Sequence, residues 1–262
     1  MNKKRYTIDE NYFEQIATEE QAYVLGVIYS DGCIYKLPTA YGLEITQVEQ
    51  DKDILVKIKD LLKSDYPLSE GIQKSNNKKR YRLYAYSKKI FDDLVKLGVT
   101  PRKSLTLEFP TFLDDRLMPH FIRGVFDGDG CIWNGKRKKV LVKDKTSKNG
   151  MRERIIHNVK FTFTGNENFI LSLQKFLNRK IGLSMNKLNY SKANNPNNTT
   201  SQNVCTLEYS GRGNIKKLYD FLYSNAKVYG LRKYEKFNEI LCANNKWLLF
   251  DLGLIAGNPL EF

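Results

Sequence analysis

The sequence predicts an α+β protein made of two pseudo-symmetric halves, each with the element order αββαββα. A pattern of thirteen residues stands twice without a gap, as AYVLGVIYSDGCI at 22–34 and as HFIRGVFDGDGCI at 120–132. The segments downstream of each copy also match, so the repeat covers most of the chain. Helical and strand-like spacings of apolar residues alternate in the same order in both halves. We therefore expect two four-stranded antiparallel sheets with helices packed against them.

The first half opens with two helix-start signals. Thr7 with Glu10 and Thr18 with Gln21 each fit a capping box, which predicts a short helix and then a longer one, each starting just after its threonine. Alternating apolar residues, turn residues and helical spacing predict the rest: strands within 33–50 that turn around 38–42, a helix over 53–62, two strands within 71–86 and a helix over 87–97.

The second half repeats this order with two polar insertions, at 134–160 and 189–203. A proline within 107–115 separates helical segments, so we place the boundary between the halves there. The predicted domains are residues 1–108 and 109–262.

Each copy of the repeated pattern predicts a helix that ends at an acidic residue and turns through Gly into a strand. Small residues four apart lie on one face of each helix: Gly26 with Ser30, and Gly124 with Gly128. Glycine inside a helix costs stability unless another group must come close. We therefore expect the two motif helices to pack along these faces, which would bring Asp31 and Asp129 together at their C-terminal ends.

Two carboxylates at helix C-termini predict a bound cation. The helix dipole already disfavours negative charge at that end, so the charge of Asp31 and Asp129 needs compensation. Carboxylate and backbone carbonyl oxygens favour a hard divalent ion such as Mg²⁺.

Composition indicates a globular protein with a polyanionic partner. Apolar residues make up 41% of the chain and aromatic residues 12%, which is enough to form real cores. Lys and Arg number 43 against 29 Asp and Glu, and the net charge of +14 favours nucleic acid as the partner. No apolar run is long enough to span a bilayer, and we expect no membrane partner. The cysteines show no CxxC pairing, and all four are predicted to be buried in an intracellular protein: Cys33, Cys131, Cys205 and Cys242.

The pair VLGVIYSDG and IRGVFDGDG resembles the two signature motifs of a single-chain LAGLIDADG homing endonuclease. The resemblance implies motif helices packed at the interface of two repeats, with eight strands forming a saddle over DNA. It implies a monomer that hydrolyses double-stranded DNA at a long, imperfectly palindromic site, with Mg²⁺ or Mn²⁺, and leaves staggered 3′ overhangs. The alternatives are a maturase that binds intron RNA and a non-catalytic DNA-binding protein of the same fold.

The resemblance also implies roles for individual residues. Asp31 and Asp129 would hold the catalytic metal, and the backbone carbonyls of Ser30 and Gly128 would be further ligands. A second set resembles the family's paired lysines and the polar residue that holds water near the metal: Lys103, Lys233 and Gln47.

The two halves depart from each other at two of these positions. Tyr29 stands where Asp127 supplies the first acidic residue of the motif in the other half. Aligning Ile45 with Phe161 places Phe163 opposite Gln47, so the second half lacks the water-holding group. We therefore expect two active sites that are not equivalent.

Basic residues in strand and loop stretches are predicted to contact DNA. A two-stranded ribbon fits the major groove, and one of its faces can present Lys and Arg to bases and phosphates. In the 134–160 insertion these are Lys136, Arg137, Lys138, Lys139, Lys143, Arg152 and Arg154. In the first half they are Lys78, Lys79, Arg80 and Arg82.

Overall fold

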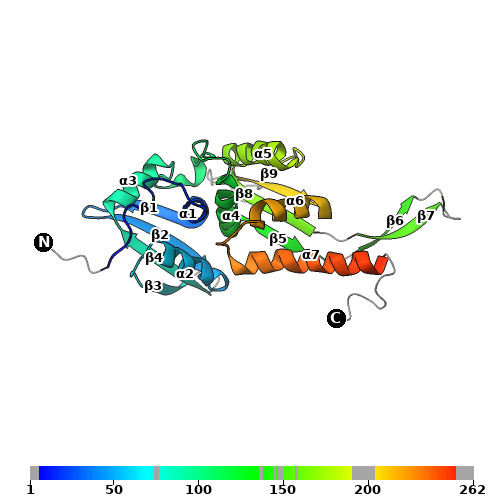
Figure 1. Cartoon of the computed structure of the whole chain (residues 1–262), viewed down its shortest axis with the longest axis horizontal. Helices are drawn as coiled ribbons and strands as arrows, with labels where there is room; N and C mark the ends of the chain where they lie inside the picture. The colour runs from blue at the N-terminus through cyan, green and yellow to red at the C-terminus, as the bar shows by residue number, and fades with distance from the viewer. Residues whose placement is uncertain are drawn as a thin grey trace.

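In the computed structural model, two halves, each with an antiparallel sheet and helices, flank a central pair of helices (Figure 1). The structure describes residues 6–73, 77–135, 138–143, 146, 150–156, 159–190 and 204–251. Among the described helices, none is long and apolar enough to cross a membrane.

The first half follows the predicted order. Its elements are α1 (Glu19–Asp31), β1 (Gly32–Lys36), β2 (Tyr41–Val48), α2 (Lys52–Leu61), β3 (Leu68–Gln73), β4 (Lys78–Tyr86) and α3 (Lys88–Lys96), with short 3-10 turns η1 (Glu49–Asp51) and η2 (Lys103–Leu105). The strands form one antiparallel sheet in the order β1-β2-β4-β3.

The second half has the same core and an addition. Its elements are α4 (Met118–Asp129), β5 (Cys131–Asn134), β8 (Val159–Asn166), α5 (Glu167–Ile181), β9 (Asn189–Tyr190), β10 (Val204–Ser210), α6 (Arg212–Tyr223) and α7 (Leu231–Asp251). The sheet order β5-β8-β10-β9 is the counterpart of the first sheet. The α+β fold with two αββαββα units is confirmed, and α7 lies outside the predicted repeat.

The insertion at 134–160 does not extend the four-stranded sheet. It forms a separate two-stranded antiparallel ribbon of β6 (Lys138–Lys143) and β7 (Met151–Ile156), so the described strands exceed the predicted eight. Figure 1 shows this ribbon projecting beyond the end of the second sheet.

The predicted capping box at Thr18 is confirmed, but the short helix before it is wrong. The Thr18 side chain accepts the Gln21 N–H while the Gln21 side chain binds the cap backbone. Upstream, residues 9–14 form turns in which Tyr12 N–H donates to the Asp9 carbonyl (3.3 Å). The Asp9 N–H donates to Leu62 O at the end of α2 (2.9 Å), so a contact distant in sequence overrides the local helix signal.

The motif helices pack along their glycines as predicted. A Cβ added to Gly26 would lie 2.1 Å from the carbonyl oxygen of Phe121, and one added to Gly124 would lie 2.2 Å from that of Tyr23. The second copy of the motif follows the first by 98 residues, and shifting residue numbers by this 98-residue repeat turns one contact into the other. The helix pair therefore has local two-fold pseudo-symmetry. Only glycine lets the two backbones approach this closely.

Each sheet packs one face on helices and leaves the other open. In β2, Leu43 and Ile45 are buried, while Glu44 between them is partly exposed. The prediction that the cysteines are buried is wrong for Cys33 and Cys131, which are exposed because they fall on the open faces of β1 and β5. Cys205 is buried in β10, and the side chain of Cys242 lies outside the described part.

Candidate active site

Asp31 and Asp129 end the two motif helices, and the close helix packing brings these ends together. A Cβ added to Gly128 would lie 1.9 Å from the Ser30 hydroxyl oxygen and 2.7 Å from Asp31 Oδ2. Gly128 therefore has no room for a side chain, because the end of α1 occupies that space. The predicted meeting of the two helix ends is observed.

The environment of these carboxyls disfavours their charge. Burial, and then the nearby charge of Asp129, raise the pKa of Asp31 to about 6, although Gln47 Nε2 donates to Asp31 Oδ2 (2.7 Å) and favours the ionised form. Asp129 is more exposed, yet loss of surrounding water raises its pKa as well. Two carboxylates held in this way favour a cation between them.

Two buried lysines reach the same helix ends. Lys103, in η2, donates from Nζ to the carbonyls of Gly32 (2.7 Å) and Ser30 (3.3 Å). Lys233, in the first turn of α7, donates to the carbonyls of Phe126 (2.6 Å), Asp127 (2.7 Å) and Gly128 (3.1 Å). These carbonyls lie at the C-terminal ends of α1 and α4, where helices leave acceptors without partners and cations are favourable.

Burial lowers the pKa of both lysines, and the surrounding carboxylates act in the opposite direction. The exposed fraction is 7% for Lys103 and 4% for Lys233, so their charges are poorly screened by water. A phosphate oxygen that approached either lysine would meet a concentrated positive charge.

The donor set fits a hard divalent ion. It contains the carboxylates of Asp31 and Asp129 and the carbonyl oxygens of Ser30 and Gly128, each of which accepts one hydrogen bond from a buried lysine and keeps a second lone pair. All four donors are oxygens, as Mg²⁺ and Mn²⁺ prefer. Within the described residues, no group of three or more His, Cys, Asp or Glu side chains lies close enough together to hold a metal ion, so the candidate site offers two carboxylates and backbone oxygens.

The prediction that Phe163 stands opposite Gln47 is wrong. The strand registers pair Cys33 with Glu44 and Cys131 with Thr162, so Phe163 corresponds to Ile45, and Gly165 corresponds to Gln47. Gln47 is buried and bound to Asp31, whereas Phe163 packs against the rings of Phe161 (centroids 5.0 Å apart) and Phe126 (5.8 Å). Phe163 therefore belongs to the core, and a glycine stands at the position in the second half that corresponds to Gln47, so the two sides of the site still differ.

Tyr29 and Asp127 occupy matching places and both bind the chain near a lysine. The Tyr29 hydroxyl donates to Leu97 O (2.5 Å), upstream of Lys103. Asp127 Oδ2 accepts the Gly230 N–H (2.7 Å), three residues before Lys233. Burial raises the pKa of Asp127 to about 6.

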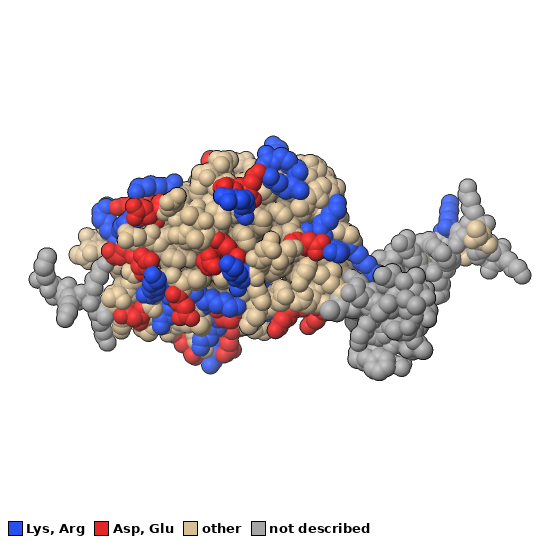
Figure 2. Space-filling view, viewed as in Figure 1, with Lys and Arg blue, Asp and Glu red and all other residues tan. Residues whose placement is uncertain are grey.

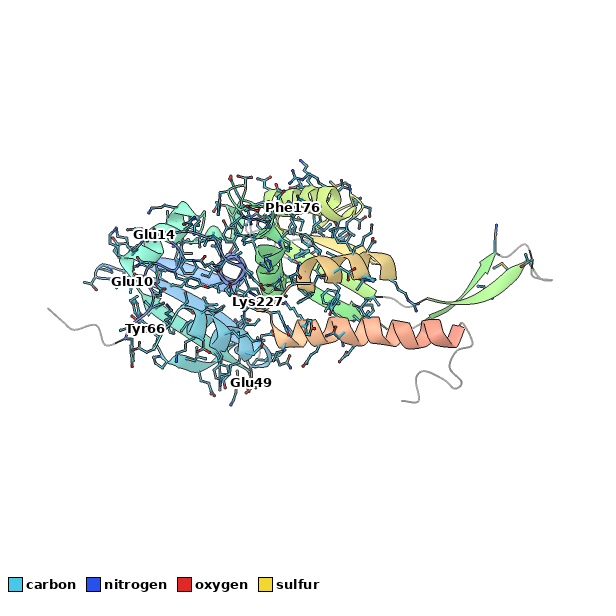
Figure 3. The ribbon with its side chains drawn as sticks, viewed as in Figure 1. Glu10, Glu14, Glu49, Tyr66, Phe176 and Lys227 are labelled. Carbon is cyan, nitrogen blue, oxygen red and sulfur yellow. The ribbon has the colours of Figure 1, made fainter. Side chains whose placement is uncertain are left out.

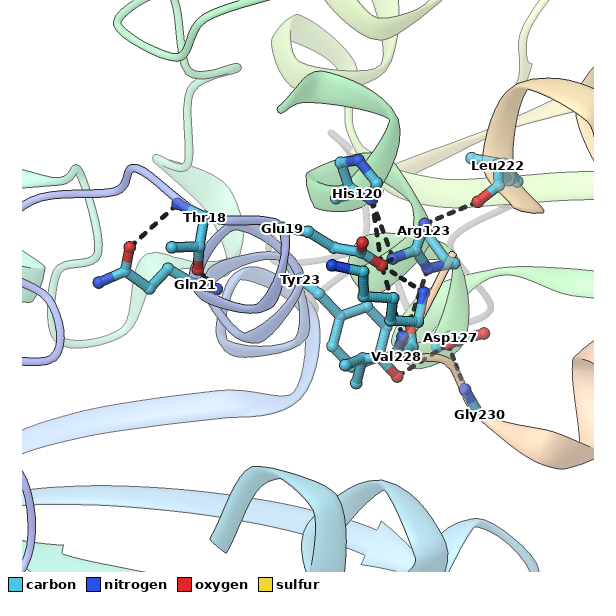
Figure 4. Close-up of polar contacts among 11 residues, drawn as sticks. Thr18, Glu19, Gln21, Tyr23, His120, Arg123, Asp127, Leu222, Val228 and Gly230 are labelled. Carbon is cyan, nitrogen blue, oxygen red and sulfur yellow. Dashed lines mark hydrogen bonds and ion pairs between the residues drawn. The ribbon is translucent and has the colours of Figure 1, made fainter. Parts of the chain in front are cut away.

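The sequence analysis missed a buried polar cluster between the motif helices, formed by residues of the first half of α1 and of the middle and end of α4. Glu19 and Tyr23 of α1 lie against Arg123 and Asp127 of α4 (Figure 4). Arg123 Nη2 binds Glu19 Oε1 (2.9 Å), and the Tyr23 hydroxyl donates to Asp127 Oδ2 (2.8 Å). The sequence did contain a signal for this cluster. Arg123 lies on the apolar face of a helix, and a charge placed there requires a partner.

A second missed contact joins the halves beside Lys233. Arg232 binds Asp51 of η1 through Nε (2.8 Å) and Nη2 (2.7 Å), in a two-point geometry. On the other side, Asn166 Nδ2 donates to Leu107 O (2.8 Å), next to a cavity of about 220 Å³ lined in part by Lys103 and Asp129. Each half therefore also holds the lysine-bearing segment of the other.

The predicted DNA-contacting residues of the first half lie on β4. Arg80 and Arg82 are on its open face, and Lys78 and Lys79 are exposed near its start. Arg82 lies 3.7 Å from Glu44, and Lys79 lies 3.3 Å from Glu70, so acidic neighbours reduce the local positive charge.

In the insertion, Lys143 is exposed in β6. Four further residues lie in β6 and β7 with side chains outside the description: Lys138, Lys139, Arg152 and Arg154. Lys136 and Arg137 lie outside the described residues. On the face shown in Figure 2, basic and acidic side chains are interspersed over the body of the protein. That face has no large patch of one sign among the described residues.

Two solved structures share this architecture over most of their length. The LAGLIDADG meganuclease I-AabMI, bound to uncleaved DNA, is 16% identical and matches 88% of this chain and 91% of that chain with a TM-score of 0.52. The LAGLIDADG homing endonuclease I-LtrWI, bound to target DNA, is 14% identical and matches 90% and 92% with a TM-score of 0.50. The chain therefore has the LAGLIDADG homing endonuclease fold, as its motifs predicted. No protein-family model and no curated protein matches the sequence.

Proposed function

We propose that this protein is a monomeric, site-specific endonuclease for double-stranded DNA. The observation that carries the proposal is the convergence of two acidic helix ends with two buried lysines, Asp31 with Lys103 and Asp129 with Lys233. Both similar structures are of DNA-bound endonucleases, which supports the same substrate class here. A net charge of +14 supports a polyanionic partner.

In the proposed site, Asp31, Asp129 and the carbonyls of Ser30 and Gly128 would hold Mg²⁺ or Mn²⁺. When bound, the ion supplies positive charge that stabilises the oxygens of the reacting phosphodiester. Gln47 would orient water by hydrogen bonding, since its amide can both donate and accept.

The lysines would act on the phosphate through their charge, since the ammonium of Lys233 already donates to three backbone carbonyls. Lys103 and Lys233 would stabilise the negative charge that develops on phosphate oxygens, one in each pocket. Their low exposure makes each charge effective, because little water separates it from the substrate.

The open faces of the two sheets would lie along the DNA grooves. Strand alternation places Arg82 and Tyr84 of β4 and Thr162 of β8 on these faces. The β6–β7 ribbon would reach DNA beyond the body of the protein. We propose staggered cuts that leave 3′ overhangs at a long target, since the two pockets lie close together across a pseudo-dyad.

The test is cleavage of a randomised DNA library with Mg²⁺, followed by Asp129→Asn on the selected target. This variant should lose double-strand cleavage, because the change removes a ligand of the metal ion. Its DNA affinity should stay within about 3-fold of the wild type, because the change also removes a negative charge that repels phosphate. Normal cutting by Asp129→Asn would refute the assignment. Specific DNA binding without cleavage by the wild type would favour a non-catalytic DNA-binding protein, and binding of intron RNA alone would favour a maturase.

A further inference from the structure

We infer that the buried ion pair between Glu19 and Arg123 positions Lys233, and that the pocket of Lys103 works without such a device. The inference rests on the proposed function for its cleavage readout, and it concerns Glu19, the first residue of α1, and Arg123, in the middle of α4. They would act through the polypeptide segment that connects α6 to α7, residues 224–230, here called the linker.

Arg123 is completely buried, and each of its nitrogens has a partner. Nη2 binds Glu19 Oε1 at 2.9 Å, Nη1 donates to Leu222 O at 2.7 Å, and Nε donates to Val228 O at 2.8 Å. Its guanidinium also lies over the ring of Tyr23, 5.4 Å from the centroid. One side chain therefore joins α1, the end of α6 and the linker.

The linker is fixed at further points by the same cluster. Glu19 Oε1 accepts the backbone N–H of Lys227 (2.6 Å), and Asp127 accepts that of Gly230 (2.7 Å). Figure 3 shows Lys227 beside the central helices, where the chain passes from α6 to α7. Lys233 follows Gly230 by three residues, so the position of the linker sets the first turn of α7 and with it the Lys233 ammonium.

The first half offers no matching pair. Under the 98-residue repeat, Leu25 stands opposite Arg123 and Leu117 stands opposite Glu19. Leucine can satisfy the packing at such positions, but it cannot bind the backbone of a linker. The charged pair therefore adds two directional hydrogen bonds to the second half, one between Glu19 and Lys227 and one between Arg123 and Val228.

Accurate placement of Lys233 matters because a group stabilising a transition state loses effect with small displacements. A shift of about 1 Å can cost on the order of 100-fold in rate. Loss of the linker bonds should therefore lower the rate of one strand cut without abolishing DNA binding.

The test replaces the pair by the residues of the other half, in the double variant Glu19→Leu with Arg123→Leu. Exchange of a buried ion pair for apolar residues is often neutral for stability, so the fold should persist. Lys233→Met and Lys103→Met first identify which DNA strand depends on each pocket. In single-turnover assays with end-labelled DNA, the double variant should slow the Lys233-dependent strand by roughly 10- to 100-fold and the other strand by less than about 3-fold. Equal slowing of both strands, or none, would overturn the inference.

A second readout does not require cleavage. Amide hydrogen exchange in the double variant should accelerate at Lys227 and Val228, whose N–H groups lose Glu19 as acceptor, and stay unchanged in residues 97–107, which include Lys103. Unchanged exchange of the linker would overturn the inference whether or not the protein is a nuclease. If the double variant does not fold, Arg123→Lys keeps the charge for Glu19 but loses the donors to Val228 and Leu222, and it should give the same strand selectivity.

Discussion

Asp31→Asn should stabilise the metal-free protein, in a manner that depends on pH. Burial and the charge of Asp129 raise the pKa of Asp31 from 3.8 to about 6. A raised acid pKa means that the unfolded chain releases its proton first. This group therefore lowers the free energy of unfolding as pH rises from about 4 to about 6, and the loss persists above that range.

The magnitude follows from the shift of about two units, which corresponds to about 3 kcal/mol at about 1.4 kcal/mol per unit. Asparagine carries no charge at this position and can still accept the bond from Gln47. The variant should gain nothing near pH 4 and up to about 3 kcal/mol at pH 7.5, or roughly 6–12 °C in Tm for a chain of this size.

The assay is thermal unfolding of wild type and variant in a chelator at pH 4, 5, 6 and 7.5. Asp220→Asn serves as the control, because it removes an exposed carboxylate of α6 that pairs with Lys216, an i,i+4 contact worth about 0.5 kcal/mol or less. Excess Mg²⁺ should raise the Tm of the wild type and reduce the advantage of Asp31→Asn. If the Tm values of wild type and Asp31→Asn do not differ at pH 7.5, or differ equally at every pH, the charge of Asp31 does not destabilise the fold and the reasoning is refuted.

Three further predictions address the helix interface, the ribbon and the asymmetry of the site. Gly124→Ala should lower the free energy of unfolding by at least about 2 kcal/mol, since its Cβ would meet the Tyr23 carbonyl at 2.2 Å. The control Gly213→Ala in α6 meets nothing within 4 Å and should be neutral or stabilising. Urea unfolding of both variants measures the difference. Replacing Lys138 and Lys139 by Ala should weaken DNA binding and make its salt dependence shallower by about one unit for each phosphate that is no longer neutralised; an unchanged slope in titrations at several salt concentrations would place these lysines in solvent. Gln47→Ala should slow one strand, relative to its own wild-type rate, by roughly 10- to 100-fold, and strand-specific labelling that shows equal slowing would contradict this.

The features that the sequence predicted well are those set by local periodicity or by the internal repeat. Gly26 and Gly124 could be recognised as a packing face because both copies of the pattern carry small residues at helical spacing, and the structure places these faces together. The Thr18 capping box formed because its partners lie within one turn. By contrast, the helix signal after Thr7 failed, because Asp9 binds the end of α2.

The exposure of Cys33 and Cys131 could not be predicted from their apolar neighbours. Each cysteine lies in a strand directly after a motif helix, and the point where the strand begins decides which face every second side chain takes. A shift of one residue in that start would have buried both. The repeat predicted only that the two cysteines would be either both buried or both exposed.

The polar cluster at Glu19 could not be predicted by comparing the two halves of the sequence. Comparison of the two halves draws attention to matching residues, such as Asp31 with Asp129, while Glu19 and Arg123 stand opposite leucines and look like departures. Their meaning depends on a third element, the linker before α7, which reaches the helix pair through contacts separated by about two hundred residues in sequence. A charged residue on an apolar helix face is therefore most informative where its repeat partner is apolar. There, packing alone would have been satisfied by leucine, and the charge must bind something that the other half lacks.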